Sequence, residues 1–151
     1  MHFVRGSLQT LGVSMAKEEK RVREYLERRL NLKFEQGRLD IGTRERVDAW
    51  AQLARPWFLI LEVEDQQNHP TTNVSKLWSF LESKRDVRVV LVHVYFPTSR
   101  AATSSRGDLA TWLGKRLERM FPKRFKYRRL DIDWGGDTCK DMKTSCALFT
   151  R

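Results

Sequence analysis

One short segment constrains the fold more than any other. Residues 57–65 read WFLILEVED, an apolar run that ends in three carboxylates. Acids at the end of a buried strand cost free energy unless a cation lies beside them. Glu62 and Glu64 are two residues apart, so in a strand both side chains project from one face, with roots about 7 Å apart. This spacing lets two flexible carboxylates converge on one hard cation.

The composition predicts one soluble domain. The chain has 151 residues, 40% of them apolar, which suits a single core. No segment approaches the roughly 20 apolar residues that span a bilayer, so we expect no membrane association. Residues 1–14 lack the long apolar core of a secretory signal, and we expect them to be a flexible extension of a domain over 15–151. The two cysteines form no disulfide framework, which favours a cytoplasmic protein.

The charge of the chain suggests its partner. With 29 Lys+Arg against 19 Asp+Glu, the formal net charge is +10, which favours nucleic acid and, after it, an anionic membrane. The basic residues gather in 115–129 and in the loop before it. Candidate phosphate contacts are Arg100, Arg106, Arg116, Arg119, Lys123, Arg124, Lys126, Arg128 and Arg129. The alternative is a solvated helix face followed by a charged edge strand that resists aggregation.

The hydrophobic pattern predicts alternating helices and strands. We expect helices at 16–30, 72–84 and 108–121, and strands at 32–41, 44–51, 57–64, 87–96 and 125–134. Thr72 or Asn73 could cap the second helix. The third helix is expected to turn inward Leu109, Trp112, Leu113, Leu117 and Met120. The order α-β-β-β-α-β-α-β predicts an α/β domain with a mixed central sheet flanked by helices.

Three acids, Asp48, Glu62 and Glu64, are candidate metal ligands. If their strands are neighbours, the carboxylates meet at one end of the sheet, and such oxygen ligands suit Mg²⁺ or Mn²⁺. A cation held there activates water and offsets charge in phosphodiester hydrolysis. Gln66, just after the strand, or Lys76, in the following helix, could orient that water or stabilise the developing charge.

Each of these residues also has an ordinary structural interpretation. Asp48 could pair with a nearby arginine, the two glutamates could form a solvated face, and Lys76 could be a solvated helix lysine. His93 lies within the apolar run 87–96, and we expect it to be a satisfied core residue.

Asp48 followed by Glu62-Val63-Glu64, in an α-β-β-β-α-β order, resembles the PD-(D/E)xK nuclease superfamily. The resemblance covers roughly residues 16–134 and implies a restriction-endonuclease-like fold with Mg²⁺- or Mn²⁺-dependent cleavage of DNA. It also implies a further acid on the first helix, where Glu19, or else Glu18, matches by position.

The chain departs from the family pattern at two positions. Val47 stands where the family has proline, and Glu64 stands where it has lysine. Some restriction enzymes of this fold also have Glu-x-Glu, and other members carry the lysine on the following helix, where Lys76 stands. A second hypothesis is therefore a nucleic-acid-binding module without catalysis, and a third is a small basic interaction protein. A homodimer would let so small a domain engage both DNA strands.

Overall fold

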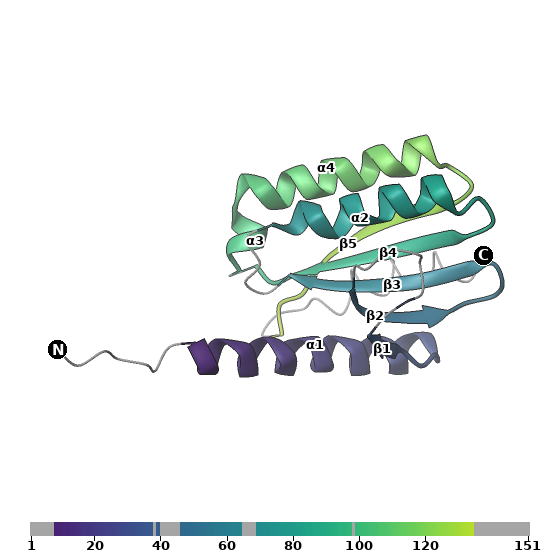
Figure 1. Ribbon diagram of the computed structural model, residues 1–151. Coiled ribbons are helices and arrows are strands. Elements are labelled where there is room, and N and C mark those ends of the chain that lie inside the picture. Colours follow the sequence, from purple (N-terminus) through teal and green to yellow (C-terminus); the bar gives the residue numbers. More distant parts are fainter. Residues whose placement is uncertain (1–7, 38, 40–45, 65–68, 98, 135–151) are drawn as a thin grey trace.

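The computed structural model describes residues 8–37, 39, 46–64, 69–97 and 99–134, with backbone alone for residues 8–16, 37, 100 and 101. The helices are α1 (Leu8–Leu30), α2 (Pro70–Ser83), α3 (Arg100–Thr103) and α4 (Ser105–Met120). The strands are β1 (Glu35–Gly37), β2 (Val47–Gln52), β3 (Trp57–Glu64), β4 (Arg88–Tyr95) and β5 (Phe125–Asp131). Figure 1 shows three layers, in which the sheet lies between α1 on one face and α2 and α4 on the other.

The sheet has the strand order β1-β2-β3-β4-β5. The pairs β1–β2 and β2–β3 are antiparallel, and the pairs β3–β4 and β4–β5 are parallel. Parallel neighbours require a crossover, and α2 and α4 provide the two crossovers on the same face. The predicted α/β class, with a mixed sheet flanked by helices, is therefore confirmed.

The alternation of β3 decides where its acids point. Leu59, Leu61 and Val63 belong to the core cluster on the α1 side, with Val22 and Leu26 of α1. Ile60 belongs to the cluster on the α2 and α4 side. Because side chains alternate along a strand, the glutamates two and four residues after Ile60 face α2. The strand's carboxyl end therefore delivers two acids beneath the start of a helix.

Several element boundaries differ from the predictions. Helix α1 begins at Leu8, inside the segment predicted to be a flexible extension. Helix α2 begins at Pro70, because proline needs no hydrogen-bond partner in the first turn of a helix. The N-cap position is His69, so Thr72 and Asn73 lie within the helix. The segment 97–107, between the predicted strand 87–96 and the predicted helix 108–121, contains α3, whose N-cap is Ser99. Among the described residues, the first strand has three residues, Glu35–Gly37. Residues 135–151 and Gln66 lie outside the described residues.

The predicted inward face of α4 is only partly confirmed, because Leu117 is buried and Leu113 packs half-buried against the core cluster on the α2 side. The buried residues of α4 are Gly107, Ala110, Gly114 and Leu117. Three residues that were expected to face inward are instead exposed. They are Leu109 (53% exposed), Trp112 (56%) and Met120 (41%). The cause is close packing on β5, since a Cβ on Gly114 would lie 2.2 Å from Cδ2 of Tyr127. Small residues allow α4 to lie this close to β5, and the three exposed apolar side chains lie on the outside of the helix.

Among the described helices, none has both the length and the apolar character of a bilayer-spanning segment.

Candidate active site

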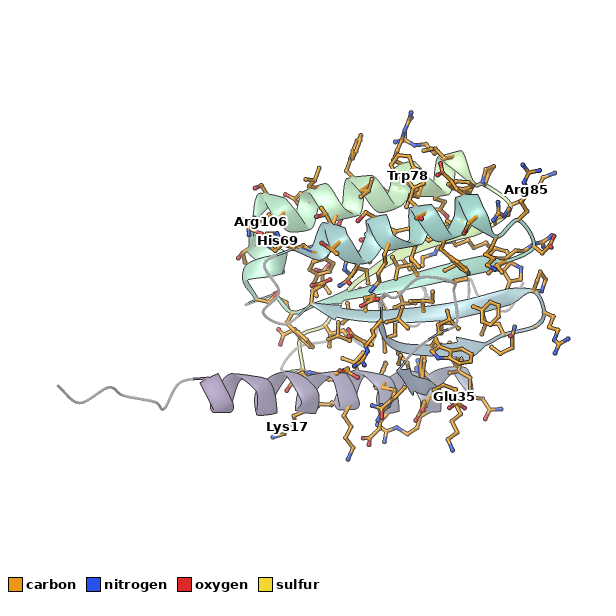
Figure 2. The ribbon with its side chains drawn as sticks, in the orientation of Figure 1. Lys17, Glu35, His69, Trp78, Arg85 and Arg106 are labelled. Atoms are coloured by element: carbon orange, nitrogen blue, oxygen red, sulfur yellow. The ribbon has the colours of Figure 1, made fainter. Side chains whose placement is uncertain are left out.

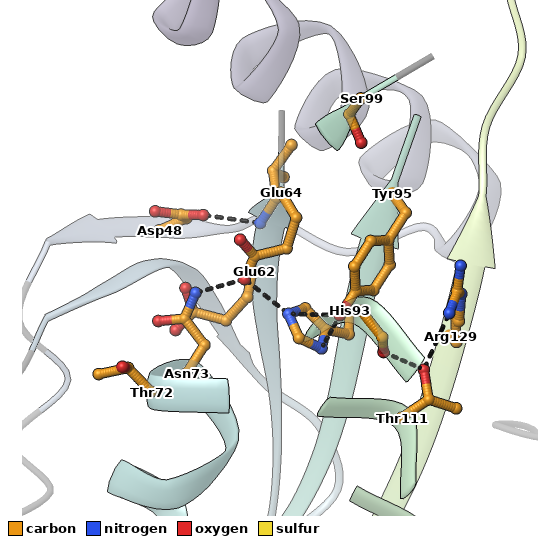
Figure 3. A network of polar contacts seen from close by, with 12 residues as sticks. Asp48, Glu62, Glu64, Thr72, Asn73, His93, Tyr95, Ser99, Thr111 and Arg129 are labelled. Carbon is orange, nitrogen blue, oxygen red and sulfur yellow. Dashed lines mark hydrogen bonds and ion pairs between the residues drawn. The ribbon is translucent and has the colours of Figure 1, made fainter. Parts of the chain in front are cut away.

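Strands β2 and β3 bring three acids together. Glu62 and Glu64 are 1% and 0% exposed and project toward α2. The register pairs Ala49 with Leu61, so one residue further along the ladder Asp48 comes opposite Glu62. Asp48 Oδ2 accepts a hydrogen bond of 2.7 Å from the Val63 backbone N–H, as Figure 3 shows. We call Asp48, Glu62 and Glu64 the acid cluster.

Helix α2 supplies a lysine to the acid cluster. Lys76 Nζ lies 2.5 Å from Glu62 Oε1, and the two side chains are 5% and 2% exposed. The same ammonium donates to Arg46 O at 2.6 Å and to Asn73 Oδ1 at 2.9 Å. The ammonium therefore has one ion pair, to Glu62, and two hydrogen bonds. Lys76 is therefore a buried partner of the acids and not a solvated helix residue.

Asn73 links the two glutamates. Its Nδ2 donates to Glu64 Oε1 at 2.6 Å while its Oδ1 accepts from Lys76 Nζ. The two α2 residues are three apart, the spacing that places helical side chains on one face. From the sequence, Asn73 is predicted only as a possible cap. The spacing N-x-x-K, from Asn73 to Lys76 just after an acidic strand, is the signal that could have identified Asn73 as a residue of the site.

His93 holds Glu64 from the opposite side. It is aligned with Glu62 on the neighbouring parallel strand, and its Nε2 lies 2.6 Å from Glu64 Oε1. With the proton on Nε2, toward the carboxylate, Nδ1 is an acceptor, and the hydroxyls of Tyr127 and Tyr95 each lie 3.2 Å from it. Burial raises the pKa of Tyr127 to about 12, which keeps that hydroxyl protonated as a donor. The predicted burial of His93 is confirmed at 0% exposure, and Glu64 is the partner that the sequence did not reveal.

Burial and mutual repulsion perturb the acids. Burial raises the pKa of Glu62 well above its ordinary value, the Asp48 charge raises it further, and Lys76 opposes both effects. Burial likewise raises the pKa of Asp48, against the hydrogen bond from Val63. A cluster that raises carboxyl pKa values in this way favours a bound cation and is common at functional sites.

The first helix contributes a fourth acid. Burial raises the pKa of Glu19, and the charge of Asp48 raises it further, so these two carboxylates share one electrostatic environment. Glu18 instead accepts a hydrogen bond of 2.9 Å from Trp134 Nε1. Of the two candidates on α1, Glu19 is the one that lies toward the acid cluster.

The acid cluster offers donors of the kind that a divalent metal binds. Its donors are carboxylate oxygens, the ligands that Mg²⁺ and Mn²⁺ prefer. Glu64 Oε2 and Glu62 Oε1 are buried and have no hydrogen-bond partner among the described residues, so each is an oxygen that a cation could take. Within the same residues, no three Asp, Glu, His or Cys side chains converge as a ready metal site. The donor chemistry suits such an ion, and Glu62 would have to exchange Lys76 for it.

Three of the basic residues predicted to contact phosphates have partners inside the fold. Arg124 donates to the carbonyls of Leu81 and Lys84 and so closes the carboxyl end of α2. Arg128 pairs with Glu118 at 3.2 Å. Arg129 pairs with Asp131 at 3.0 Å, and its guanidinium lies 4.3 Å from the centre of the Tyr95 ring.

The other basic residues lie nearer to the surface. Lys126 is half-buried, with Nζ 5.3 Å from the centre of the Trp57 ring. The side chain of Arg100 lies outside the described part of the chain. The exposed members of the set are Arg106, Arg116, Arg119 and Lys123.

Comparisons of the chain with family models, with curated proteins and with solved structures found no match.

Proposed function

We propose that the chain is a Mg²⁺- or Mn²⁺-dependent nuclease of the PD-(D/E)xK type that hydrolyses phosphodiester bonds in DNA. The observation that carries the proposal is the 2.5 Å contact between Lys76 Nζ and Glu62 Oε1. Hydrolysis of a phosphodiester needs a cationic group beside the acids to stabilise developing charge. The chain has glutamate where the family motif has lysine, and a lysine from α2 takes that place in the acid cluster.

The strand order supports the same proposal. An antiparallel β1–β2–β3 unit is followed by α2 and by β4, which is parallel to β3. Asp48 on β2 and the Glu-x-Glu pair on β3 occupy the places that the restriction-endonuclease-like resemblance gives to an acid and an acid-x-lysine motif. Glu19 on α1 agrees with the further acid that the resemblance implies.

The proposed roles follow from the contacts. Asp48, Glu62 and Glu64 would hold the divalent ion, which when bound would polarise the phosphodiester and activate water. When Glu62 turns to the ion, Lys76 keeps two acceptors, Arg46 O and Asn73 Oδ1. Its third hydrogen then becomes available to a phosphate oxygen or to the attacking water. Asn73 and His93 would fix the orientation of Glu64 during this exchange.

Plasmid cleavage tests the proposal. Purified protein is incubated with supercoiled plasmid and Mg²⁺ or Mn²⁺, and nicked and linear products are quantified. We expect Glu62→Ala and Lys76→Met to lower the rate by at least about 100-fold, as removal of a main electrostatic group does in other enzymes. Arg85→Ala is the control, because it removes an exposed cation at the other end of α2 (Figure 2). Cleavage by Lys76→Met at the wild-type rate would exclude the proposed role.

A second candidate is a nucleic-acid-binding module that keeps this fold without catalysis. It is favoured by the fact that every member of the acid cluster already has a donor from the protein. This candidate predicts DNA binding that weakens steeply with salt and no cleavage with any divalent ion. A mobility-shift assay at two salt concentrations, beside the plasmid assay, separates it from the nuclease. A small basic interaction protein would bind no DNA at moderate salt.

A further inference from the structure

The outer face of α4 has a composition that the fold does not explain. In the described part of the chain, the exposed large apolar side chains are Leu109, Trp112 and Met120, and all three lie on this helix. Trp112, 56% exposed, points away from the sheet, because the helix turns its small residues toward β5. A tryptophan exposed to this extent on a helix surface is a candidate contact residue.

Cations surround this tryptophan. Lys115, Arg116 and Arg119 follow Trp112 by three, four and seven residues, the spacings that share one helical face, and all three are exposed. The two acids of α4 do not neutralise them, because each has a basic partner on β5. Asp108 lies 3.8 Å from Arg129 Nη1, and Glu118 lies 3.2 Å from Arg128 Nη1. The face therefore combines an aromatic surface with a positive charge.

We propose that this face binds a single strand of nucleic acid, with an unpaired base stacked on Trp112 and phosphates held by Lys115, Arg116 and Arg119. Stacking of bases on aromatic side chains next to a cationic track is the common mode of single-strand binding. The inference rests on the nucleic-acid partner proposed above but does not depend on cleavage.

Charge and spacing argue against a protein occupant. A second copy packed face to face would bring two sets of three cations together, and like charges across an interface oppose association. A partner helix needs a continuous apolar stripe, but Leu109 and Met120 are eleven residues, or about 16 Å, apart along the helix. Arg116 interrupts the stripe between them. Complementarity of charge therefore favours a polyanion.

The position of the helix connects this face to the acid cluster. Arg106, in the first turn of α4, lies at the same end of the helical layer as His69, the residue before α2 (Figure 2). This is the edge where β3 ends at Glu64. A strand that follows α4 from Arg119 to Arg106 would run toward the acids, so the face would guide an unpaired segment to the proposed site.

Fluorescence anisotropy with a labelled oligothymidylate tests the inference. Binding is measured in EDTA at several salt concentrations between about 50 and 200 mM. We expect Trp112→Ala to weaken binding roughly 5- to 150-fold at every salt concentration without changing the salt slope, because stacking releases no counterions. Arg116→Gln should reduce the slope by about 0.7, the value for one phosphate contact on a single strand. Arg85→Ala, which removes an exposed cation at the other end of α2, is the control and should bind as wild type.

Three results would overturn the inference. The first is that Trp112→Ala binds the oligonucleotide with wild-type affinity. The second is that this variant loses duplex binding and single-strand binding equally. The third is that the wild type sediments as a dimer and Trp112→Ala as a monomer. The last result would assign the face to a second copy. Because EDTA removes divalent ions, an inactive acid cluster leaves these measurements unchanged. Lys76→Met that binds oligonucleotide normally but does not cleave plasmid would support both proposals.

Discussion

At the scale of one residue, Asp48 shows that the acid cluster lowers the free energy of unfolding when no cation is bound. The raised pKa values of Asp48 and Glu62 mean that the folded chain retains protons which the unfolded chain releases. The stability from these groups is fully present below the ordinary carboxyl pKa of about 4, and it is lost as the pH rises through the raised values. In the absence of divalent ions, this cluster therefore lowers the free energy of unfolding at neutral pH.

Asp48→Asn is expected to stabilise the protein at pH 8 and to abolish cleavage. The amide oxygen can still accept from the Val63 N–H, while the charge that repels Glu62 and Glu19 is removed. We expect a gain of about 1–2 kcal/mol at pH 8, typical of single stabilising changes, and a smaller difference between pH 5 and pH 8. Urea unfolding in EDTA measures the gain at pH 8 and the difference between pH 5 and pH 8. Asp86→Asn, at an exposed position, is the control. A less stable Asp48→Asn protein at pH 8 would contradict this account.

His93→Leu should destabilise the protein strongly. The change leaves the Glu64 carboxylate buried without the Nε2 donor, and breaking a buried pair in this way costs about 3–5 kcal/mol. His93→Gln can offer an amide donor and should lose less. In Glu64→Met/His93→Leu, neither polar group remains, so much of the lost stability should return. Denaturant unfolding of the three variants checks this order. A double variant as unstable as the sum of its single changes would show that the two side chains act independently.

The acids of the cluster were predictable from the sequence, and so was Lys76, but Asn73 and His93, which hold Glu64, were not predicted as its partners. A buried strand that ends in Glu-x-Glu identifies Glu62 and Glu64, because carboxylates in such a strand require an explanation. The signal for Asn73 is ambiguous, since its N-x-x-K spacing to Lys76 competes with the fact that an amide in the first helical turn also fits a cap. For His93, the apolar run predicted burial, but its partner depends on the parallel register of β3 with β4, which is a long-range property.

At the scale of the elements, α4 shows how close packing overrides hydrophobic periodicity. The large apolar residues of a surface helix normally mark its buried face. In α4 the buried residues are Gly107, Ala110, Gly114 and Leu117, and of these only Leu117 adds strongly to an apolar pattern. In contrast, β3 was predicted with its observed ends, Trp57 and Glu64, because a continuous apolar run between two polar turns has few alternatives. The sequence reveals which segments are buried more readily than how closely they approach.

Gly114→Ala provides a test of this contact because two effects oppose each other. Helix propensity alone favours alanine over glycine by about 1 kcal/mol. The new Cβ, however, would lie 2.2 Å from Tyr127 Cδ2, and overpacking of this kind costs about 1–3 kcal/mol. We expect the clash to prevail and thermal unfolding to occur at a lower temperature. Lys115→Ala, at the exposed neighbouring position, should change stability by less than about 0.5 kcal/mol. A more stable Gly114→Ala protein would mean that α4 can move away from β5.

At the scale of the whole molecule, the parallel half of the sheet sets the location of the site. The carboxyl ends of β3, β4 and β5 lie at one edge, and α2 and α4 begin there (Figure 1). Open α/β sheets bind ligands at this edge, because loops and helix N-termini converge on it. In this chain β2 adds Asp48 from the antiparallel half of the sheet. The acid cluster therefore lies where both halves of the sheet meet, beside α2.

Divalent cations are expected to stabilise the whole fold through this junction. A ligand that binds the folded chain alone adds RT ln(1 + [L]/Kd), about 2.7 kcal/mol at 100 times Kd. For a chain of this length, each kcal/mol raises the unfolding temperature by about 2–4 °C. Mg²⁺, or Ca²⁺ as a probe that separates binding from cleavage, should therefore raise the unfolding temperature of the wild type by several degrees relative to NaCl of equal ionic strength. Asp48→Asn and Glu64→Gln start from different stabilities, so the quantity compared is the change in unfolding temperature that the cation causes within each variant. We expect this change to be close to zero in both variants. Equal shifts in the wild type and in both variants would place the binding of the cation elsewhere on the protein.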